Sequence, residues 1–439
     1  MTSAAPGKNP FSTSEKRPPL GLGFLISVVR NAGHKVFFID NYLSPEKFIE
    51  GKFLSVNKID IVGIYSNTIC FESTIKMLQD IQELRINKEW GGILVVGGPH
   101  VSVAIGTIPD YVDFIVYGEG EKAILDIING SASERIIKNP PNRNLDALPF
   151  QPWDIFTKLE YDFTSRWFNE RPVFTMNTSR GCPFDCSFCS VGGIWGRQYT
   201  YFSAERIIEE ILFLKENYRA RGIYFREDNF TLNTRRIEKF CRLIVKKGID
   251  ITWACETRVD NITRELLKSM SEAGCRALYL GVESGSRKIL DLLNKSINTD
   301  QVENVVNWGK EFNIRTYCSL IAGVPGESVV DLIKTYMLMR RIKPYSYAFN
   351  IFVGLPGSAL YRKIYDEKSY EFMDGLGLLY MPGFDVKTEY FYRSHSSEYI
   401  DYKFKKRKLY DRILQIVIVF RKIKNLLRRI KGKSRLLHL

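Results

Sequence analysis

The chain has 439 residues and a formal net charge of +14, with 45% hydrophobic and 13% aromatic residues. This length exceeds one ordinary domain, and the composition suits a soluble protein with two or three packed domains. No run of 18 apolar residues occurs, so we expect no membrane-spanning helix. Most of the eight cysteines are scattered singly in apolar runs, which argues against a disulfide framework and for a reducing, cytoplasmic setting.

The first 19 residues are polar and Pro-rich, lack the apolar core of a secretory signal, and are expected to be disordered. Residues 20–137 alternate helical patterns with apolar strand-like runs, which is typical of a doubly wound α/β domain. The patterns predict helices over Leu20–Asn31 and Glu72–Glu83, and strands over Lys35–Asp40, Ile59–Tyr65, Gly92–Val96 and Phe114–Tyr117.

Polar or glycine-rich turns follow three of these predicted strands. Ligands bind at the carboxyl ends of strands in such sheets, and glycine lets a flat ligand approach the backbone closely. Ordinary turn chemistry is the alternative interpretation. The candidate residues are Ser66, Asn67, Thr68, Gly97, Gly98, Gly118 and Glu119.

Residues 138–172 are rich in Pro and Asn and are interpreted as a linker. Beyond it, a loop carries Cys182, Cys186 and Cys189 with C-x3-C-x2-C spacing. Three thiolates can hold one face of a metal cluster but leave one iron without a protein ligand, open to a small molecule. A zinc knuckle is the alternative, but it usually needs a fourth Cys or His, and the nearest other cysteine is Cys241.

Residues 173–357 repeat strand and helix patterns that predict a six-stranded partial (β/α) barrel. Ser203 and Thr263 are candidate helix N-caps. Polar clusters follow four of the strands, at the ends where barrels of this type carry out chemistry. Singly they read as caps and ion pairs, but together, after a three-cysteine loop, they predict a site. The clusters are Glu227–Asn229, Glu256–Asp260, Gly281–Ser286 and Ala322–Glu327.

The cysteine spacing, with Phe188 before the third cysteine, resembles the radical S-adenosylmethionine enzymes. The stretches RPPLGLGFL, AGHKVFFID, GGPHVS and YGEGE resemble the cobalamin-binding domain that precedes the radical core in many of them. The resemblance implies a 4Fe-4S cluster on the three cysteines and S-adenosylmethionine bound at the open iron. It further implies cleavage to a 5′-deoxyadenosyl radical, a bound cobalamin, and an external electron donor such as flavodoxin or ferredoxin.

The resemblance also implies roles for individual residues. Glu227 or Asp228 would contact the methionine ammonium, and Arg258 the methionine carboxylate. Glu283 and the neighbouring Ser284 would contact the ribose. The adenine would lie against Phe188 and the turn formed by Gly323, Pro325 and Gly326. The turn residues of the first domain would bind cobalamin.

Two features depart from the cobalamin-binding pattern. Asp40 is followed by Asn41-Tyr42-Leu43 rather than by the Asp-x-His-x-x-Gly motif, so we predict no protein histidine from that motif on the cobalt. Relatives also begin with an apolar strand, whereas GKNPFSTSEK stands here. Loss of a central strand would leave its neighbours without a partner.

Residues 358–439 form an extension whose last part, 401–439, holds fourteen Lys or Arg against two acidic residues. Apolar residues recur there at helical spacing, which suits an anionic membrane surface, at the inner face of the membrane. Docking on the barrel is the alternative; nucleic-acid binding lacks any reading motif and is not expected.

The sequence therefore predicts a radical S-adenosylmethionine enzyme that transfers a methyl group to an unactivated carbon of a small-molecule or lipid-like substrate. Cobalamin-dependent oxidative cyclisation or rearrangement is the alternative within the family. A zinc-bearing basic nucleic-acid-binding protein is the alternative of another class.

Overall fold

The computed structural model describes residues 16–43, 51–367, 371–372 and 379–380. The basic segment 401–439 and most of the N-terminal stretch 1–19, for which disorder is predicted, therefore lie outside the described residues. Within the described ranges, no helix combines the length and the apolar character needed to cross a membrane.

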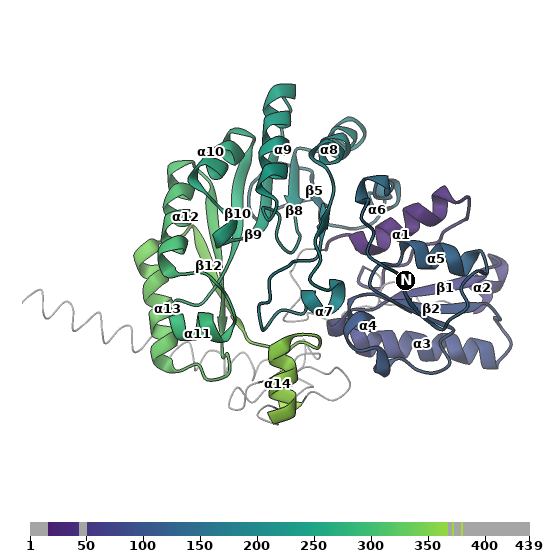
Figure 1. The fold of residues 1–439 in the computed structure, drawn as a ribbon. Coiled ribbons are helices and arrows are strands. Elements are labelled where there is room, and N and C mark those ends of the chain that lie inside the picture. Colours follow the sequence, from purple (N-terminus) through teal and green to yellow (C-terminus); the bar gives the residue numbers. More distant parts are fainter. Residues whose placement is uncertain (1–15, 44–50, 368–370, 373–378, 381–439) are drawn as a thin grey trace, which may run out of the picture.

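The N-terminal unit is a parallel four-stranded sheet in the order β1-β2-β3-β4, with helices on its faces (Figure 1). Its strands are β1 (Ile61–Tyr65), β2 (Ile93–Gly97), β3 (Phe114–Tyr117) and β4 (Ile136–Lys138). Its helices are α1 (Leu20–Asn31), α2 (Gly51–Val56), α3 (Phe71–Ile86), α4 (Pro99–Val103) and α5 (Glu121–Ile128). Apolar residues of β1, β2 and α3 form one buried cluster, which fixes the sheet against its helices.

The predicted strand Lys35–Asp40 is wrong, because only Asp40 makes an isolated bridge. A strand needs a neighbour to pair with. Among the described residues, β1 is the edge strand of its sheet, and no strand lies between β1 and the segment Lys35–Asp40 to pair with that segment. The apolar side chains pack without a ladder instead: Phe37 lies edge-on to Phe53 at 5.4 Å between ring centroids, and Phe38 lies edge-on to Phe156 at 5.7 Å.

The second unit is, as predicted, a partial barrel of six parallel strands (Figure 1). The strands lie in the order β12-β11-β10-β9-β8-β5. The strands are β5 (Val173–Met176), β8 (Gly222–Phe225), β9 (Thr252–Arg258), β10 (Cys275–Glu283), β11 (Arg315–Ala322) and β12 (Ser346–Ile351). The long helices that cover the outer face are α8 (Ala204–Tyr218), α9 (Thr234–Lys247), α10 (Arg264–Glu272), α12 (Thr299–Glu311) and α13 (Val329–Ile342). Shorter helices are α11 (Arg287–Leu292) and α14 (Ala359–Glu367).

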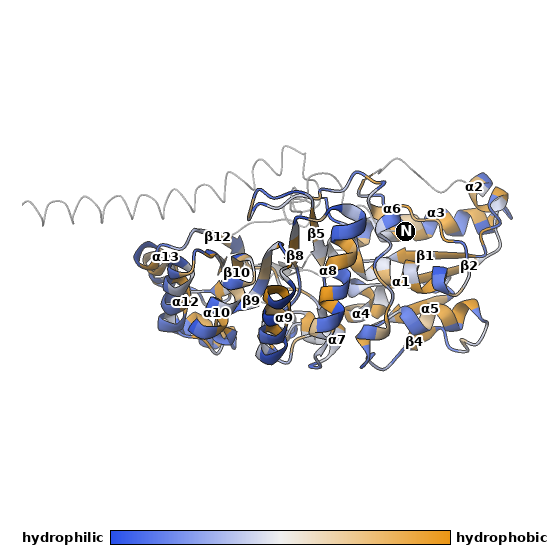
Figure 2. Ribbon diagram, turned by 90° about the horizontal axis from the view of Figure 1, so that it is seen from above, coloured by the Kyte–Doolittle hydropathy of each residue, from blue (hydrophilic) through white to orange (hydrophobic). Residues whose placement is uncertain are grey.

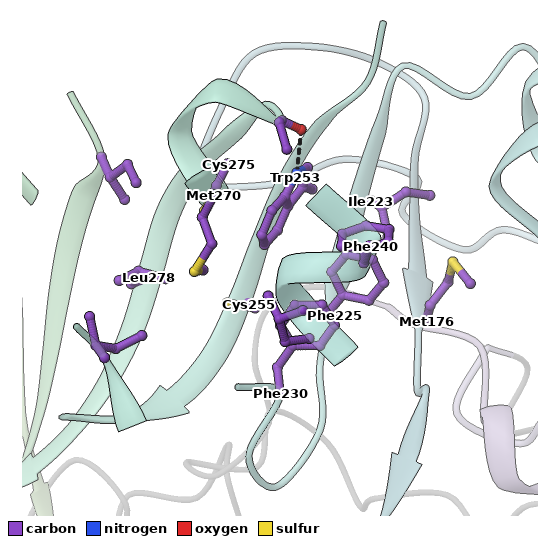
Figure 3. Close-up of a cluster of buried hydrophobic side chains, with 14 of the residues drawn as sticks. Met176, Ile223, Phe225, Phe230, Phe240, Trp253, Cys255, Met270, Cys275 and Leu278 are labelled. Carbon is purple, nitrogen blue, oxygen red and sulfur yellow. Dashed lines mark hydrogen bonds between the residues drawn. The ribbon is translucent and has the colours of Figure 1, made fainter. Parts of the chain in front are cut away.

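Helix starts follow the predicted caps. The side chain of Ser203 accepts the N–H of Arg206, and that of Thr263 accepts the N–H of Leu266, which satisfies donors that an uncapped helix end leaves open. The outer helices turn charged residues to solvent and apolar residues to the strands (Figure 2). Between β8, β9 and α9 the core is aromatic: Trp253 and Phe240 lie 5.6 Å apart in edge-on contact (Figure 3).

The two units share a core. Phe24 of α1 packs edge-on to Phe202 at 6.0 Å, and Trp153 packs edge-on to Phe174 of β5 at 5.1 Å. Trp153 begins α6 (Trp153–Phe156), a single helical turn within the segment predicted to be a linker. Because both aromatic residues of this turn are fully buried, the segment joins the units by packing as well as by connection.

Candidate functional site

A cavity of about 620 Å³ lies between the N-terminal sheet and the carboxyl ends of the barrel strands. It brings together most of the predicted site residues from both units. These are Cys182, Cys186, Phe188, Cys189, Glu227, Asp228, Arg258 and Glu283 from the barrel, and Gly97, Gly98, Gly118 and Glu119 from the N-terminal unit. The remaining predicted residues are not in its lining: Ser66, Asn67, Thr68, Ser284, Gly323, Pro325 and Gly326.

The cysteine loop is enclosed by a short antiparallel pair, β6 (Ser179–Arg180) with β7 (Thr200–Tyr201). Gly181 turns the chain at φ +79°, and a Cβ there would lie 2.2 Å from the carbonyl oxygen of Gln198, so only glycine fits. Ser187 anchors the far side of the loop: its N–H donates to the Leu293 carbonyl at 2.9 Å. The loop is therefore fixed at both sides while its thiols face the cavity.

All three thiols are free and partly exposed. Burial raises the pKa of Cys182, and it raises the pKa of Cys189 to about 12. Metal ligation requires thiolates, so these sulfurs become good ligands only when a positive centre replaces the proton. Among the described residues, no three His, Cys, Asp or Glu side chains are placed to hold a single metal ion. Three thiols on one wall of a cavity fit the chemistry of a cluster with a vacant corner.

Two acidic residues follow β8 beside the loop. Glu227 accepts hydrogen bonds from Thr178 Oγ1 at 2.7 Å and from Ser179 Oγ, and burial raises its pKa to about 7. Burial also raises the pKa of Asp228, to about 6. A cationic ammonium would compensate the desolvated carboxylates, so the pair suits the methionine ammonium that the family resemblance implies here.

Arg258 ends β9 and reaches the cysteine loop. Its Nε and Nη2 donate to the two carboxylate oxygens of Asp260 at 2.9 and 2.7 Å, and its Nη1 donates to Cys186 Sγ at 3.1 Å. The guanidinium lies 3.6 Å from the ring centroid of Phe184. A forked, oriented cation next to the thiols is suited to gripping a carboxylate.

Glu283 ends β10 at φ +63°, where the pairing with β11 shifts register. Its Oε1 accepts a hydrogen bond from Nζ of Lys295 at 2.9 Å, and both side chains are buried. The lysine offsets the charge of the carboxylate, and the unusual backbone conformation aims it into the cavity. Lys295 lies twelve residues further along the chain, and the sequence offers no local signal for this pairing.

The predicted adenine turn and Ser284 lie beside the cavity rather than in its lining. Ser284 Oγ is hydrogen-bonded to Thr335 Oγ1 at 3.0 Å. The N–H of Gly323 donates to Oε2 of Glu327 at 2.6 Å, and the carbonyl of Gly326 accepts from Lys288 Nζ at 2.6 Å. These residues shape the ends of β10 and β11, and their contact with a nucleoside stays a prediction.

On the opposite wall, glycines bring bare backbone to the cavity. A Cβ on Gly63 or Gly118 would meet no atom within 4 Å, so both leave open space where a side chain would stand. Gly98, at φ +115°, packs against the Ser66 carbonyl, which a Cβ would approach to 2.4 Å. A glycine-lined wall of this kind fits a large flat ligand such as a corrin.

The residues Ser66, Asn67 and Thr68 serve local structure. Ser66 N–H donates to the Gly97 carbonyl at 2.8 Å. Asn67 caps a 3₁₀ turn by accepting the N–H of Cys70, and Thr68 is 3.2 Å from a ring nitrogen of buried His100. These contacts lie within the N-terminal unit, and the contact of the three residues with cobalamin stays a prediction.

Sequence reasoning did not single out Arg180 or Glu121, both of which line the cavity. Nη2 of Arg180 lies 2.5 Å from Oε1 of Glu121, and Nη1 lies 3.2 Å from Oε2 of Glu119. The signal lay in the acidic turn of YGEGE and in the lone basic residue before the first cysteine, but nothing in the spacing links them.

The comparisons with known proteins agree with this geometry. The model of the Radical SAM superfamily matches residues 176–339, and that of the B12 binding domain matches residues 13–128. An uncharacterized methyltransferase of Pyrococcus horikoshii is 30% identical over 367 residues, covering 78% of each chain. The anaerobic magnesium-protoporphyrin IX monomethyl ester cyclase of Rubrivivax gelatinosus is 26% identical, covering 80% of this chain and 67% of that one.

The fold is also shared with a solved structure, the cobalamin-dependent S-adenosylmethionine radical enzyme OxsB with aqua-cobalamin bound. The TM-score is 0.68 at 16% sequence identity, covering 83% of this chain and 62% of that one. At this identity the likeness concerns the arrangement of the two units, and about two fifths of that enzyme has no counterpart in the alignment.

Proposed function

The chain belongs to the radical S-adenosylmethionine superfamily and carries a B12-binding domain ahead of its radical core, and on this premise we propose that it methylates an unactivated carbon of a small molecule. The observation that carries the proposal is the shared cavity. The three cysteines form one wall and the glycine turns of the B12-binding domain form the other. Cofactors for radical generation and for methyl transfer would thus meet one substrate.

The residues that would hold each group follow from their positions. Cys182, Cys186 and Cys189 would ligate the 4Fe-4S cluster, and the wall containing Gly63 and Gly118 would hold cobalamin. When bound, the cluster and cobalamin supply one-electron and methyl-transfer chemistry that side chains cannot. The chain itself orients the cosubstrate, with Glu227 and Asp228 for its ammonium, Arg258 for its carboxylate and Glu283 for its ribose.

The substrate has the remaining part of the cavity. Apolar side chains also line the wall of the B12-binding domain, among them Leu22, Leu25, Val116 and Ile124, so a substrate that lies beside the bound cobalamin there would be apolar or lipid-like. An external electron donor and attachment of residues 401–439 to a membrane surface stay predictions from the sequence. Oxidative cyclisation remains the second candidate because the Rubrivivax relative is named as a cyclase.

A labelling experiment separates the two candidates. The anaerobically reconstituted protein, with cobalamin and a reductant, would be incubated with S-adenosylmethionine carrying a deuterated methyl group and with an extract of the cells that make the protein. We expect a product that is heavier by one labelled methyl group. A product altered by loss of hydrogen, without label, would favour cyclisation and contradict methyl transfer.

A further inference from the structure

Both ends of the cysteine loop are anchored to the B12-binding domain. Arg180 lies two residues before Cys182 and contacts two carboxylates of that domain. Gly193 lies four residues after Cys189, in α7 (Val191–Trp195), which packs beside α4 of the same domain (Figure 1). The domain that lines one wall of the cavity therefore also holds the loop that forms the other wall.

The first anchor is a buried charge cluster. Arg180 contacts Glu121 through both terminal nitrogens, with Nη2 2.5 Å from Oε1 and Nη1 3.3 Å from Oε2. Its Nη1 is also 3.2 Å from Oε2 of Glu119, and the three side chains are only 11%, 12% and 7% exposed, respectively. Separating the loop from the domain would leave these buried charges without their partners, which is energetically costly. The geometry therefore opposes that separation.

Aromatic rings hold the guanidinium in place. The central carbon of Arg180 lies 5.4 Å from the ring centroid of Phe24 in α1 and 5.8 Å from that of Trp195 in α7. One ring belongs to the B12-binding domain and the other to the helix after the cysteine loop. Arg180 is therefore in contact with both sides of the interface at once.

The second anchor, at Gly193 in α7, is closely packed. A Cβ on Gly193 would lie 2.9 Å from the Cα of Gly357 and 3.1 Å from Cγ1 of Val103. A Cβ on Gly357 would lie 2.5 Å from the same Val103 atom. The loop helix, α4 and the segment after the barrel thus meet in close contact, so the cysteine loop and the B12-binding domain pack directly against each other at this end.

We propose that Arg180 is a positioning residue that couples the cobalamin site to the cysteine loop, so that cobalamin and the cluster strengthen each other's binding. The inference rests on the proposed function. Gly118 and Glu119 line the cavity in the turn that Arg180 grips, so a ligand that orders this turn also orders the residue two positions before Cys182. Such coupling must act equally in both directions.

The test compares the Kd of hydroxocobalamin, followed by its visible absorbance, for cluster-free and cluster-reconstituted protein. We expect the wild-type chain to bind roughly tenfold more tightly when the cluster is present, within the usual range of coupling. In Arg180→Gln/Glu121→Gln, which removes one charge of each sign, the ratio should fall to about one. Arg180→Lys is a second variant, which keeps the charge but loses the forked guanidinium. Its ratio of Kd values should lie between those of the wild type and the double variant.

The control is Arg206→Gln/Glu210→Gln, a buried ion pair within α8 with a 3.0 Å contact, whose two residues do not line the cavity. It should leave the tenfold ratio intact. A wild-type ratio of one, or an unchanged ratio in the Arg180 variants, would overturn the inference while leaving the proposed function standing. Failure of the wild-type chain to bind cobalamin at all would overturn both.

Discussion

Arg258 donates a hydrogen bond from Nη1 to the sulfur of Cys186 at 3.1 Å, which ties the end of a barrel strand to the middle of the cysteine loop. The same guanidinium is held by both oxygens of Asp260, so its orientation is set before any ligand arrives. The site is thus partly pre-organised by residues of β9.

The first prediction concerns this ion pair. Arg258→Gln leaves the carboxylate of Asp260 with little water and no cation, since the two side chains are 6% and 15% exposed. We expect the free energy of unfolding of the metal-free chain to fall by about 3–5 kcal/mol, measured in urea. Arg258→Gln/Asp260→Asn should recover most of that loss. If Arg258→Gln alone is as stable as the wild type, the ion pair does not contribute to the stability of the fold.

The second prediction concerns the central thiol. Cys186→Ala removes one of three ligands, so anaerobic reconstitution should give little cluster and no 5′-deoxyadenosine, while the circular dichroism spectrum stays unchanged. Cys318→Ala is the control, because that thiol is buried in β11 and does not line the cavity. Retained cleavage of S-adenosylmethionine by Cys186→Ala would contradict the ligand assignment.

The third prediction concerns pH. Burial raises the pKa of Glu227 from 4.5 to about 7, so the folded chain holds this proton more tightly than the unfolded chain does. The protonated carboxyl therefore favours folding below pH 4.5, and the contribution is lost as the pH rises through about 7. Glu227→Gln does not titrate, and its stability relative to wild type should rise by about 3 kcal/mol over this range.

Urea unfolding of both chains across this pH range measures the effect. Glu209→Gln, at an exposed position of α8, provides the matched control and should run parallel to wild type. If the Glu227→Gln and wild-type curves also run parallel, the carboxyl is not desolvated in the folded chain.

The fourth prediction concerns the glycine wall. Gly63→Ala adds a methyl group in open space at the edge of the cavity, so the melting temperature should change little. The methyl group would occupy the volume assigned to the corrin, and we expect at least about a tenfold loss of cobalamin affinity, equivalent to about 1.4 kcal/mol. Gly106→Ala, also unobstructed but outside the cavity lining, should bind normally. Equal affinity in all three proteins would place cobalamin elsewhere.

Local signals predicted much of the fold. The bounds of α1 and β3 agree with the prediction, because their apolar patterns are complete within the segment. The polar cluster Glu256–Asp260, predicted to follow a strand, instead overlaps β9, which continues to Arg258. The last residues of β9 are polar because they face the cavity. A strand predicted from its apolar residues therefore ends before them.

Residues brought together by tertiary packing were harder to predict. The cysteines were found because their spacing along the chain reflects their shared ligand. The contacts between Arg180 and Glu119, and between Lys295 and Glu283, join residues that are distant in sequence, and no spacing rule relates them. The strand predicted over Lys35–Asp40 failed for the same reason, since pairing depends on a neighbour that its own residues do not reveal.

Anaerobic reconstitution with iron, sulfide and hydroxocobalamin, followed by metal and corrinoid analysis, tests the shared cavity most directly. We expect about four iron atoms and about one corrinoid per chain, with release of 5′-deoxyadenosine once S-adenosylmethionine and a reductant are added. A chain that takes up zinc in place of iron, or that binds the cluster but no corrinoid, would contradict the account.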